Sequence, residues 1–112
     1  MKLKSILAVA LLVVSSASHA EKPKKTEAEY MAFCKSVYDL SKNIMIGRQG
    51  GTSMIEMIET AKGNGVAEFI VNEAFKVSRK RTEEYINRSV EVFSNKMYQS
   101  CYQDVRKKFN KK

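Results

Sequence analysis

Two cysteines limit the folds open to this chain more than any other feature. Cys34 and Cys101 are the only cysteines among its 112 residues, so oxidation allows a single intramolecular pairing. That bond would close a loop of about 68 residues, and the chain-entropy model assigns such a loop roughly 4 kcal/mol of stabilisation. This is a large share of the total stability of a small domain, which is typically about 5–15 kcal/mol. The alternative is two free thiols, and the compartment decides between the two states.

The first 20 residues have the three parts of a secretory signal peptide. Lys2 and Lys4 precede an apolar run at 6–14, and the small residues Ser18 and Ala20 fit cleavage after Ala20. The apolar run is about half of the ~20 residues that a helix needs to cross a bilayer. A cleaved signal is therefore favoured over an uncleaved membrane anchor. We expect an exported product, periplasmic or secreted, that has no transmembrane segment and lies in a compartment where the disulfide forms.

Removal of the signal peptide also removes the only histidine, His19. Without an imidazole base, Ser-His-Asp and Cys-His nucleophilic catalysis are excluded, as are zinc sites of the Cys/His kind. No glycine-rich phosphate-binding loop is present. The carboxylate pairs Glu56/Glu59 and Glu83/Glu84 leave acid–base chemistry as the one enzymatic alternative. Because these pairs fall on helix faces expected to be solvated, we predict that the protein is not an enzyme and holds no cofactor or metal.

Apolar residues recur at the 3–4 spacing of amphipathic helices, and no convincing alternation of period two occurs. The pattern predicts an all-α fold, a small bundle of about four helices in one domain over 26–112, after a flexible basic tail at 21–25. The predicted helices cover about 27–48, 54–62, 66–77 and 82–108.

Capping signals support the predicted helix starts. Thr26 with Glu29 and Ser53 with Glu56 have the spacing of capping boxes, and Thr52 is the alternative cap of the second helix. Asn64 can cap the third helix, and Thr82 or Ser78 the last. Gly63 suits the left-handed position after the second helix.

Each predicted helix has an apolar stripe that we expect to face the core. Cys34 lies on the first stripe and Cys101 on the last, so the disulfide would join the first and last helices. The predicted inward residues are Tyr30, Phe33, Val37, Tyr38, Leu40, Ile44 and Met45 in the first helix, Met54, Ile55, Ile58 and Ala61 in the second, Val66, Phe69, Ile70, Ala74 and Val77 in the third, and Ile86, Val90, Phe93, Met97 and Val105 in the last.

The stretch Arg48-Gln49-Gly50-Gly51 separates the first two apolar runs. We expect Gly50 to take positive φ at the helix end, Arg48 to interact with the helix dipole, and Gly51 to let the chain reverse. Gln49 has no such local role, but it could tie the corner to a neighbouring backbone. The stretch is therefore either a structural corner or a site where Arg48 and Gln49 donate hydrogen bonds to an anionic or peptide ligand.

The layout Cys34…NIMIGRQGGTS…VNEAF…TEEYINRSVEVFSNKMYQSC resembles a group of small exported, largely uncharacterised helical proteins of bacteria and their prophages. The group has a matching Arg-Gln-x-Gly-x-Ser corner after its first helix. This chain departs from the group before its last helix, where KVSRKRTEE stands in place of an aromatic-proline turn. The resemblance implies export, helices and a disulfide, and it implies no activity.

Basic residues outnumber acidic ones, and removal of Lys2 and Lys4 lowers the formal net charge from +8 to +6. They cluster in KPKK at 22–25, in Arg79-Lys80-Arg81 and in RKKFNKK at 106–112. Outside the cytoplasm such clusters attract lipopolysaccharide, anionic lipids and cell-wall polymers. The alternative is a solvated surface that keeps the protein soluble, and no specific nucleic-acid motif accompanies the clusters.

We therefore predict an exported periplasmic or envelope protein that acts by binding another protein or an anionic envelope component. Its candidate binding residues are Arg48, Gln49, Arg79, Lys80 and Arg81. The alternative is a peripheral membrane-surface protein that docks on anionic lipid through its basic C-terminal helix. No sequence feature specifies an oligomeric state.

The export hypothesis predicts the mass of the mature chain. When the full gene is expressed in a bacterium, intact-mass spectrometry of the periplasmic fraction should show a chain that starts at Glu21 and is two hydrogens lighter than the reduced form. Retention of residues 1–20 on a membrane-bound product would contradict the prediction of a cleaved signal.

Overall fold

The computed structural model describes residues 25–110, so the predicted signal peptide and most of the predicted tail lie outside the described residues. Helix α2 covers Glu27–Gln49, α3 Met54–Ala61, α4 Gly65–Ala74 and α5 Glu83–Asn110. The predicted all-α class with four helices is confirmed. The largest difference in bounds is at the third helix, which ends at Ala74 instead of continuing to residue 77. Among residues 25–110, no helix has both the length and the apolar character that crossing a bilayer requires.

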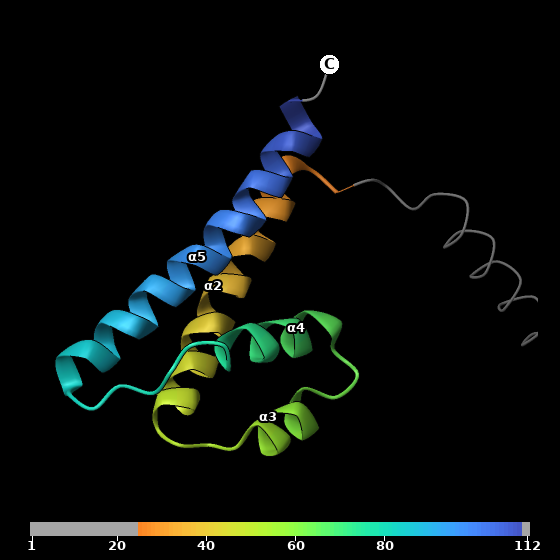
Figure 1. Ribbon diagram of the computed structural model, residues 1–112. Helices are drawn as coiled ribbons and strands as arrows, with labels where there is room; N and C mark the ends of the chain where they lie inside the picture. Colours follow the sequence, from red (N-terminus) through yellow and green to blue (C-terminus); the bar gives the residue numbers. More distant parts are fainter. Residues whose placement is uncertain (1–24, 111–112) are drawn as a thin grey trace, which may run out of the picture.

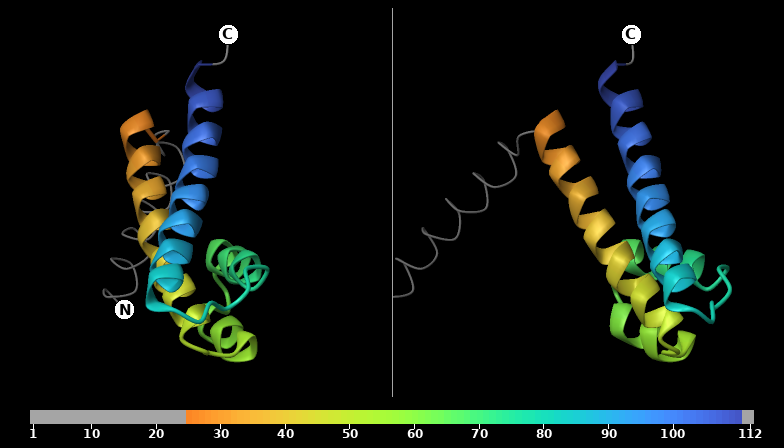
Figure 2. Two further views of the ribbon diagram at one scale, coloured as in Figure 1. Left: turned by 60° about the vertical axis from the view of Figure 1, so that its left-hand side comes forward. Right: turned by 90° about the vertical axis from the view of Figure 1, so that its left-hand side faces the viewer.

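The two long helices, α2 and α5, run antiparallel and side by side (Figure 1). The short helices α3 and α4 lie at one end of this hairpin, where α2 ends and α5 begins (Figure 2). Helix α4 packs against α2, and α3 packs against α4. The bundle is therefore a long two-helix hairpin with a pair of short helices at its base.

Each helix starts at a residue whose side chain caps it. Thr26 and Glu29 form both bonds of a capping box, at 3.1 and 2.8 Å. Ser53 accepts from the Glu56 amide at 3.1 Å, and Asn64 accepts from Ala67 at 3.0 Å. Of the two caps predicted for α5, Thr82 and Ser78, the structure has Thr82, whose hydroxyl accepts from the Tyr85 amide at 3.3 Å. These bonds satisfy amide groups that the first turn of a helix leaves without partners.

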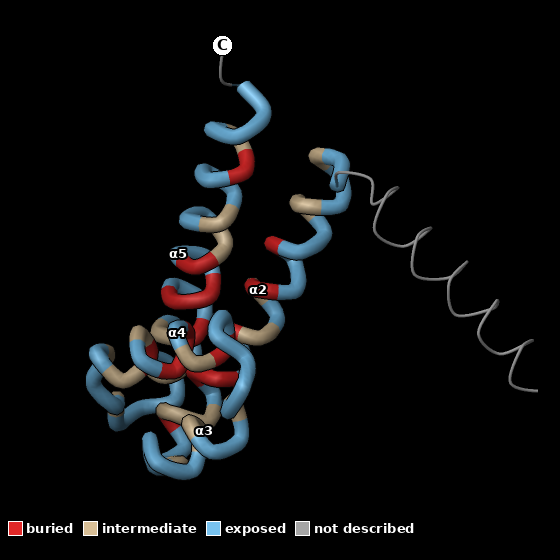
Figure 3. The backbone as a smooth tube through the Cα atoms, turned by 90° about the vertical axis from the view of Figure 1, so that its right-hand side faces the viewer, coloured by how far each residue is buried: buried red, intermediate tan, exposed pale blue. Residues whose placement is uncertain are grey.

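The hydrophobic core lies where α2, α4 and α5 meet at the base of the hairpin (Figure 3). The inward stripe predicted for α5 is largely confirmed, and in α2 Cys34, Val37, Ile44 and Met45 are buried as predicted. The buried core cluster comprises Val37, Ile44, Met45, Ile70, Val71, Ala74, Val90, Phe93 and Met97.

The prediction of which residues face the core was partly wrong. Phe33 in α2, Met54 and Ile55 in α3, and Val66 and Phe69 in α4 are exposed. Helix α3 buries none of its residues fully, because α4 is its main neighbour. In helix α4, Ala67 and Val71 face the core. Their side chains, one small and one branched, fit the close packing of α4 against α2.

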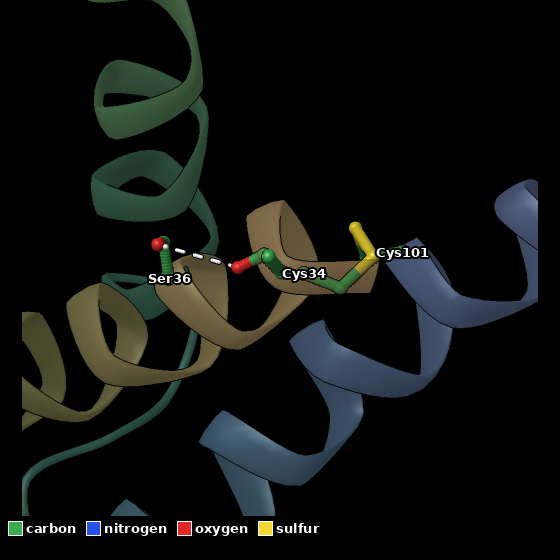
Figure 4. Close-up of a disulfide and its surroundings, with 4 residues drawn as sticks. Cys34, Ser36 and Cys101 are labelled. Carbon is green, nitrogen blue, oxygen red and sulfur yellow. Dashed lines mark hydrogen bonds between the residues drawn. A yellow bond between two sulfur atoms is a disulfide. The ribbon is translucent and has the colours of Figure 1, made fainter. Parts of the chain in front are cut away.

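The disulfide between Cys34 and Cys101 is formed as predicted, with the two Cα atoms 5.5 Å apart (Figure 4). It joins α2 to α5 above the core. Beyond it lies the hairpin tip, which we define as residues 27–33 and 102–110. The tip is held by the buried Val105, by Tyr30 and Phe109 with ring centroids 5.6 Å apart, and by the ion pair of Glu27 with Arg106. Since α3 and α4 lie at the other end, the tip depends on the disulfide more than the base does.

Replacement of both cysteines by serine should lower the free energy of unfolding by roughly 4 kcal/mol, the loop-closure value for this separation. Urea titration of the oxidised protein and the variant measures the difference. In hydrogen exchange, amides of the hairpin tip should lose protection first, because the core cluster still holds the base. A uniform loss along α2 and α5 would contradict the assignment of the tip to the disulfide.

Candidate functional site

Gln49, the residue of the Arg-Gln-Gly-Gly stretch with no local role, faces inward and is only 3% exposed. Its Nε2 donates to the Ser78 carbonyl at 2.9 Å, and its Oε1 accepts from the Lys80 amide at 2.7 Å. The side-chain amide of Gln49 therefore bonds the backbone carbonyl before residue 79 and the backbone N–H after it, in the way that one β-strand bonds its neighbour. Both polar ends of this buried group are satisfied within the protein, so Gln49 is not presented to a ligand.

The flanking arginines strengthen the same connection. Arg48 Nε donates to the Val77 carbonyl at 3.0 Å, and its guanidinium lies 4.5 Å from the centre of the Phe75 ring. In return, Arg79 Nε donates to the Gln49 carbonyl at 3.3 Å. We name this set the corner clamp: the side chains of Arg48, Gln49 and Arg79 with the backbone of residues 77–80. It joins the corner after α2 to the loop between α4 and α5.

The predicted positive φ at Gly50 was wrong. Helix α2 continues through Gln49, and Gly50 keeps a right-handed φ of −80° with its amide bonded to Ile46 at 2.9 Å. Gly51 takes the positive φ, at 99°, and the chain reverses there. A Cβ at Gly51 would also lie 3.3 Å from Nη2 of Arg79. The positive φ requires a glycine here, and the clamp arginine lies against it. The predicted positive φ at Gly63 is confirmed, at 88°.

The structure separates the five candidate binding residues. Arg48, Gln49 and Arg79 belong to the corner clamp and hold the fold. Arg81 is exposed in the turn before α5. Gln49 lines a pocket between α2 and α5, but both ends of its amide are already bonded within the protein. Lys80 is half-buried and lines a second concave surface, a groove in which its charge is available.

This α4–α5 groove lies between the end of α4, the following loop and the first half of α5, and its volume is about 490 Å³. Four of its side chains are basic and one is acidic. Two more, Tyr85 and Val92, are 54% and 58% exposed. The lining residues are Glu73, Lys76, Val77, Lys80, Tyr85, Arg88, Ser89, Val92, Phe93 and Lys96.

The corner clamp shapes one wall of this groove. Val77 and Lys80 both line it, and both are bonded through their backbone to clamp side chains at 3.0 and 2.7 Å. Lys80 Nζ is also bonded to the Ser78 hydroxyl at 3.0 Å. The connection between helices is thus held in place before any ligand arrives.

Sequence reasoning missed Lys76, Arg88 and Lys96, because only contiguous basic clusters were considered. A signal was present within α5: Tyr85, Arg88, Val92 and Lys96 follow one another at intervals of 3 or 4, which places them on one helix face. The contribution of Lys76 depends on how α4 packs near α5, which the pattern of α5 alone does not reveal.

The other predicted features occupy different surfaces. Arg106 is paired with Glu27, and Lys108 Nζ lies 5.4 Å from the centre of the Tyr30 ring, so part of the C-terminal basic cluster serves the hairpin tip. The carboxylate pairs Glu56/Glu59 and Glu83/Glu84 are exposed. Within the part of the chain that the structure describes, no three potential metal-ligating side chains of the His, Cys, Asp or Glu type come together.

Comparison with known proteins returned no matching family model, curated protein or solved structure. The resemblance to small exported proteins of bacteria and prophages therefore stays a prediction.

Gln49→Ala should lower the free energy of unfolding by about 2–3 kcal/mol, since it leaves the Ser78 carbonyl and the Lys80 amide without their partner. Thermal and urea unfolding measure this loss, with Gln103→Ala on the exposed face of α5 as the matched control. A Gln49→Ala variant as stable as the control would mean that the clamp does not support the fold.

Proposed function

We propose that this is an exported binding protein whose partner is an anionic component of the cell envelope, held at the α4–α5 groove. The observation that carries the proposal is the composition of this groove. Its lining contains one carboxylate, that of Glu73, and four basic side chains: Lys76, Lys80, Arg88 and Lys96. In a concave surface, side chains of one sign raise the local potential and attract counter-charged ligands.

Binding is favoured over catalysis by the chemistry of the side chains. The predicted mature chain has no imidazole, and both cysteines are consumed by the disulfide. The carboxylates of Glu56 and Glu59 are exposed on a single short helix, and those of Glu83 and Glu84 are exposed at the start of α5. Carboxylate catalysis needs two such groups facing each other across a cleft, one of them with a raised pKa.

Docking through the basic end of α5 is the second candidate. Lys107 and Lys108 are exposed there and could meet an anionic membrane surface. The groove is preferred because Arg106 and Lys108 are already engaged with Glu27 and Tyr30, and because the groove combines charge with concave shape.

Charge reversal in the groove tests the proposal. The double variant Arg88→Glu/Lys96→Glu should bind anionic vesicles and lipopolysaccharide at least tenfold more weakly than the unchanged protein, as measured by co-sedimentation at low salt. Binding by the unchanged protein should weaken between low and moderate salt, because exposed charges are screened. Circular dichroism establishes that each variant is folded.

The matched control is Lys107→Glu/Lys108→Glu, which changes the net charge by the same amount at the other end of α5. Full binding by this control would place the interaction at the groove, whereas an equal loss would favour docking through the C-terminal helix. Failure of the unchanged protein to bind either anion, together with in-cell cross-linking to a single protein, would replace an anionic component with a protein partner.

A further inference from the structure

We infer that the α4–α5 groove takes a single phosphate-bearing lipid molecule, with the phosphate among its cations and the first part of an acyl chain against Tyr85 and Val92. This inference rests on the proposed function and adds the chemical class of the ligand. It follows from three properties of the groove: its exposed apolar side chains, its arrangement of cations and its size.

The apolar side chains distinguish this groove from a plain anion site. Val92 is 58% exposed and Tyr85 54% exposed. Both are on the face of α5 that lines the groove, where Val92 lies between Arg88 and Lys96 and Tyr85 lies one turn before Arg88. A small hydrophilic anion would leave these surfaces in water. A hydrocarbon chain would cover them, and removal of apolar area from water favours binding. The groove therefore suits a ligand with an anionic end and an apolar end.

The cations suit a phosphate as that anionic end. Glu73 neutralises Lys76 through a 2.8 Å ion pair, which leaves Lys80, Arg88 and Lys96 to meet a ligand. Arg88 lies 6.0 Å from the centre of the Tyr85 ring, so its guanidinium is close to the apolar surface. Arginine binds phosphate oxygens through two parallel hydrogen bonds, and lysines supply further positive charge.

The size of the groove favours one small amphiphile over a macromolecule. A volume of about 490 Å³ falls in the range of small-molecule sites, about 300–1,000 Å³. A single-stranded nucleic acid would follow a longer basic track with several stacking aromatic residues, whereas Tyr85 is the one exposed aromatic side chain in the lining. The corner clamp fixes the wall at Val77 and Lys80 in advance, which reduces the ordering that binding requires.

The test compares three monomeric probes by isothermal titration calorimetry on the oxidised chain that starts at Glu21. Dihexanoyl phosphatidylglycerol, below its micelle concentration, carries both features. Glycerol phosphate carries only the anion, and the lipid dihexanoylglycerol carries the acyl chains without a phosphate. We expect the first probe to bind at least tenfold more tightly than either of the others. Relative to glycerol phosphate, burial of roughly two methylenes would supply this increment, and relative to the uncharged lipid it would come from the phosphate bound by the groove cations.

Two substitutions separate the parts of the ligand. Val92→Ser should lower the affinity for dihexanoyl phosphatidylglycerol several-fold and leave the affinity for glycerol phosphate unchanged. Arg88→Gln should lower both affinities. Phe33→Ser, which removes an exposed apolar side chain from α2, serves as the control and should change neither affinity.

Equal affinity for glycerol phosphate and dihexanoyl phosphatidylglycerol would overturn the inference in favour of a free phosphate compound. Equal affinity for the two lipids would overturn the role of the anion. If anionic vesicles bind at the groove while the monomeric lipid does not, the lipid-molecule inference fails and the proposed function stands. Absence of binding to vesicles, lipopolysaccharide and all three probes would overturn both.

Discussion

The hydrogen bonds of the Gln49 side chain are the contacts on which the arrangement of this protein most depends. They link the end of α2 to the loop that leads into α5, two segments far apart in the sequence. Because α2 and α5 are the two long helices of the hairpin, this link fixes where the second helix starts relative to the end of the first. The amide group is well suited to the task, since it can donate to one backbone carbonyl and accept from a backbone amide at the same time. An apolar side chain of the same size would leave two part-buried backbone groups without this partner.

The hairpin is held by different interactions at its two ends. At the base, α4 covers the contact between α2 and α5, so apolar packing around Met45, Ile70 and Phe93 supplies the stability. At the tip, no third helix from residues 25–110 contributes, and the Cys34–Cys101 bond joins the two helices directly. This division explains why a chain with so small a core can support an α5 of 28 residues. A covalent bond that restricts the unfolded chain compensates for apolar area that the tip cannot bury.

The proposed binding surface follows from this framework. The clamp that completes the fold also holds the backbone of Val77 and Lys80, which form a wall of the α4–α5 groove. Arg48 and Arg79 were candidate binding residues in the sequence, but their side chains bond within the corner clamp. Other basic side chains line the groove. The arginine and glutamine side chains of the corner clamp thus support the wall of the proposed binding surface.

The sequence by itself determined the helices, their caps and the disulfide. These depend on neighbours within one turn, as in Thr26 with Glu29, or on the only pairing that two cysteines allow. The tertiary structure decided which faces are buried in the short helices. Ile55, on an apolar stripe, is 76% exposed because α3 has one main neighbour. It also decided the role of Gln49, whose partners lie 29 and 31 residues away. The same reason applies to the groove, since Lys76 and Lys96 come together only when α4 and the first half of α5 pack near each other. The spacing of apolar residues predicts which residues share a helix face. The packing of the helices decides whether that face contacts another helix or the solvent.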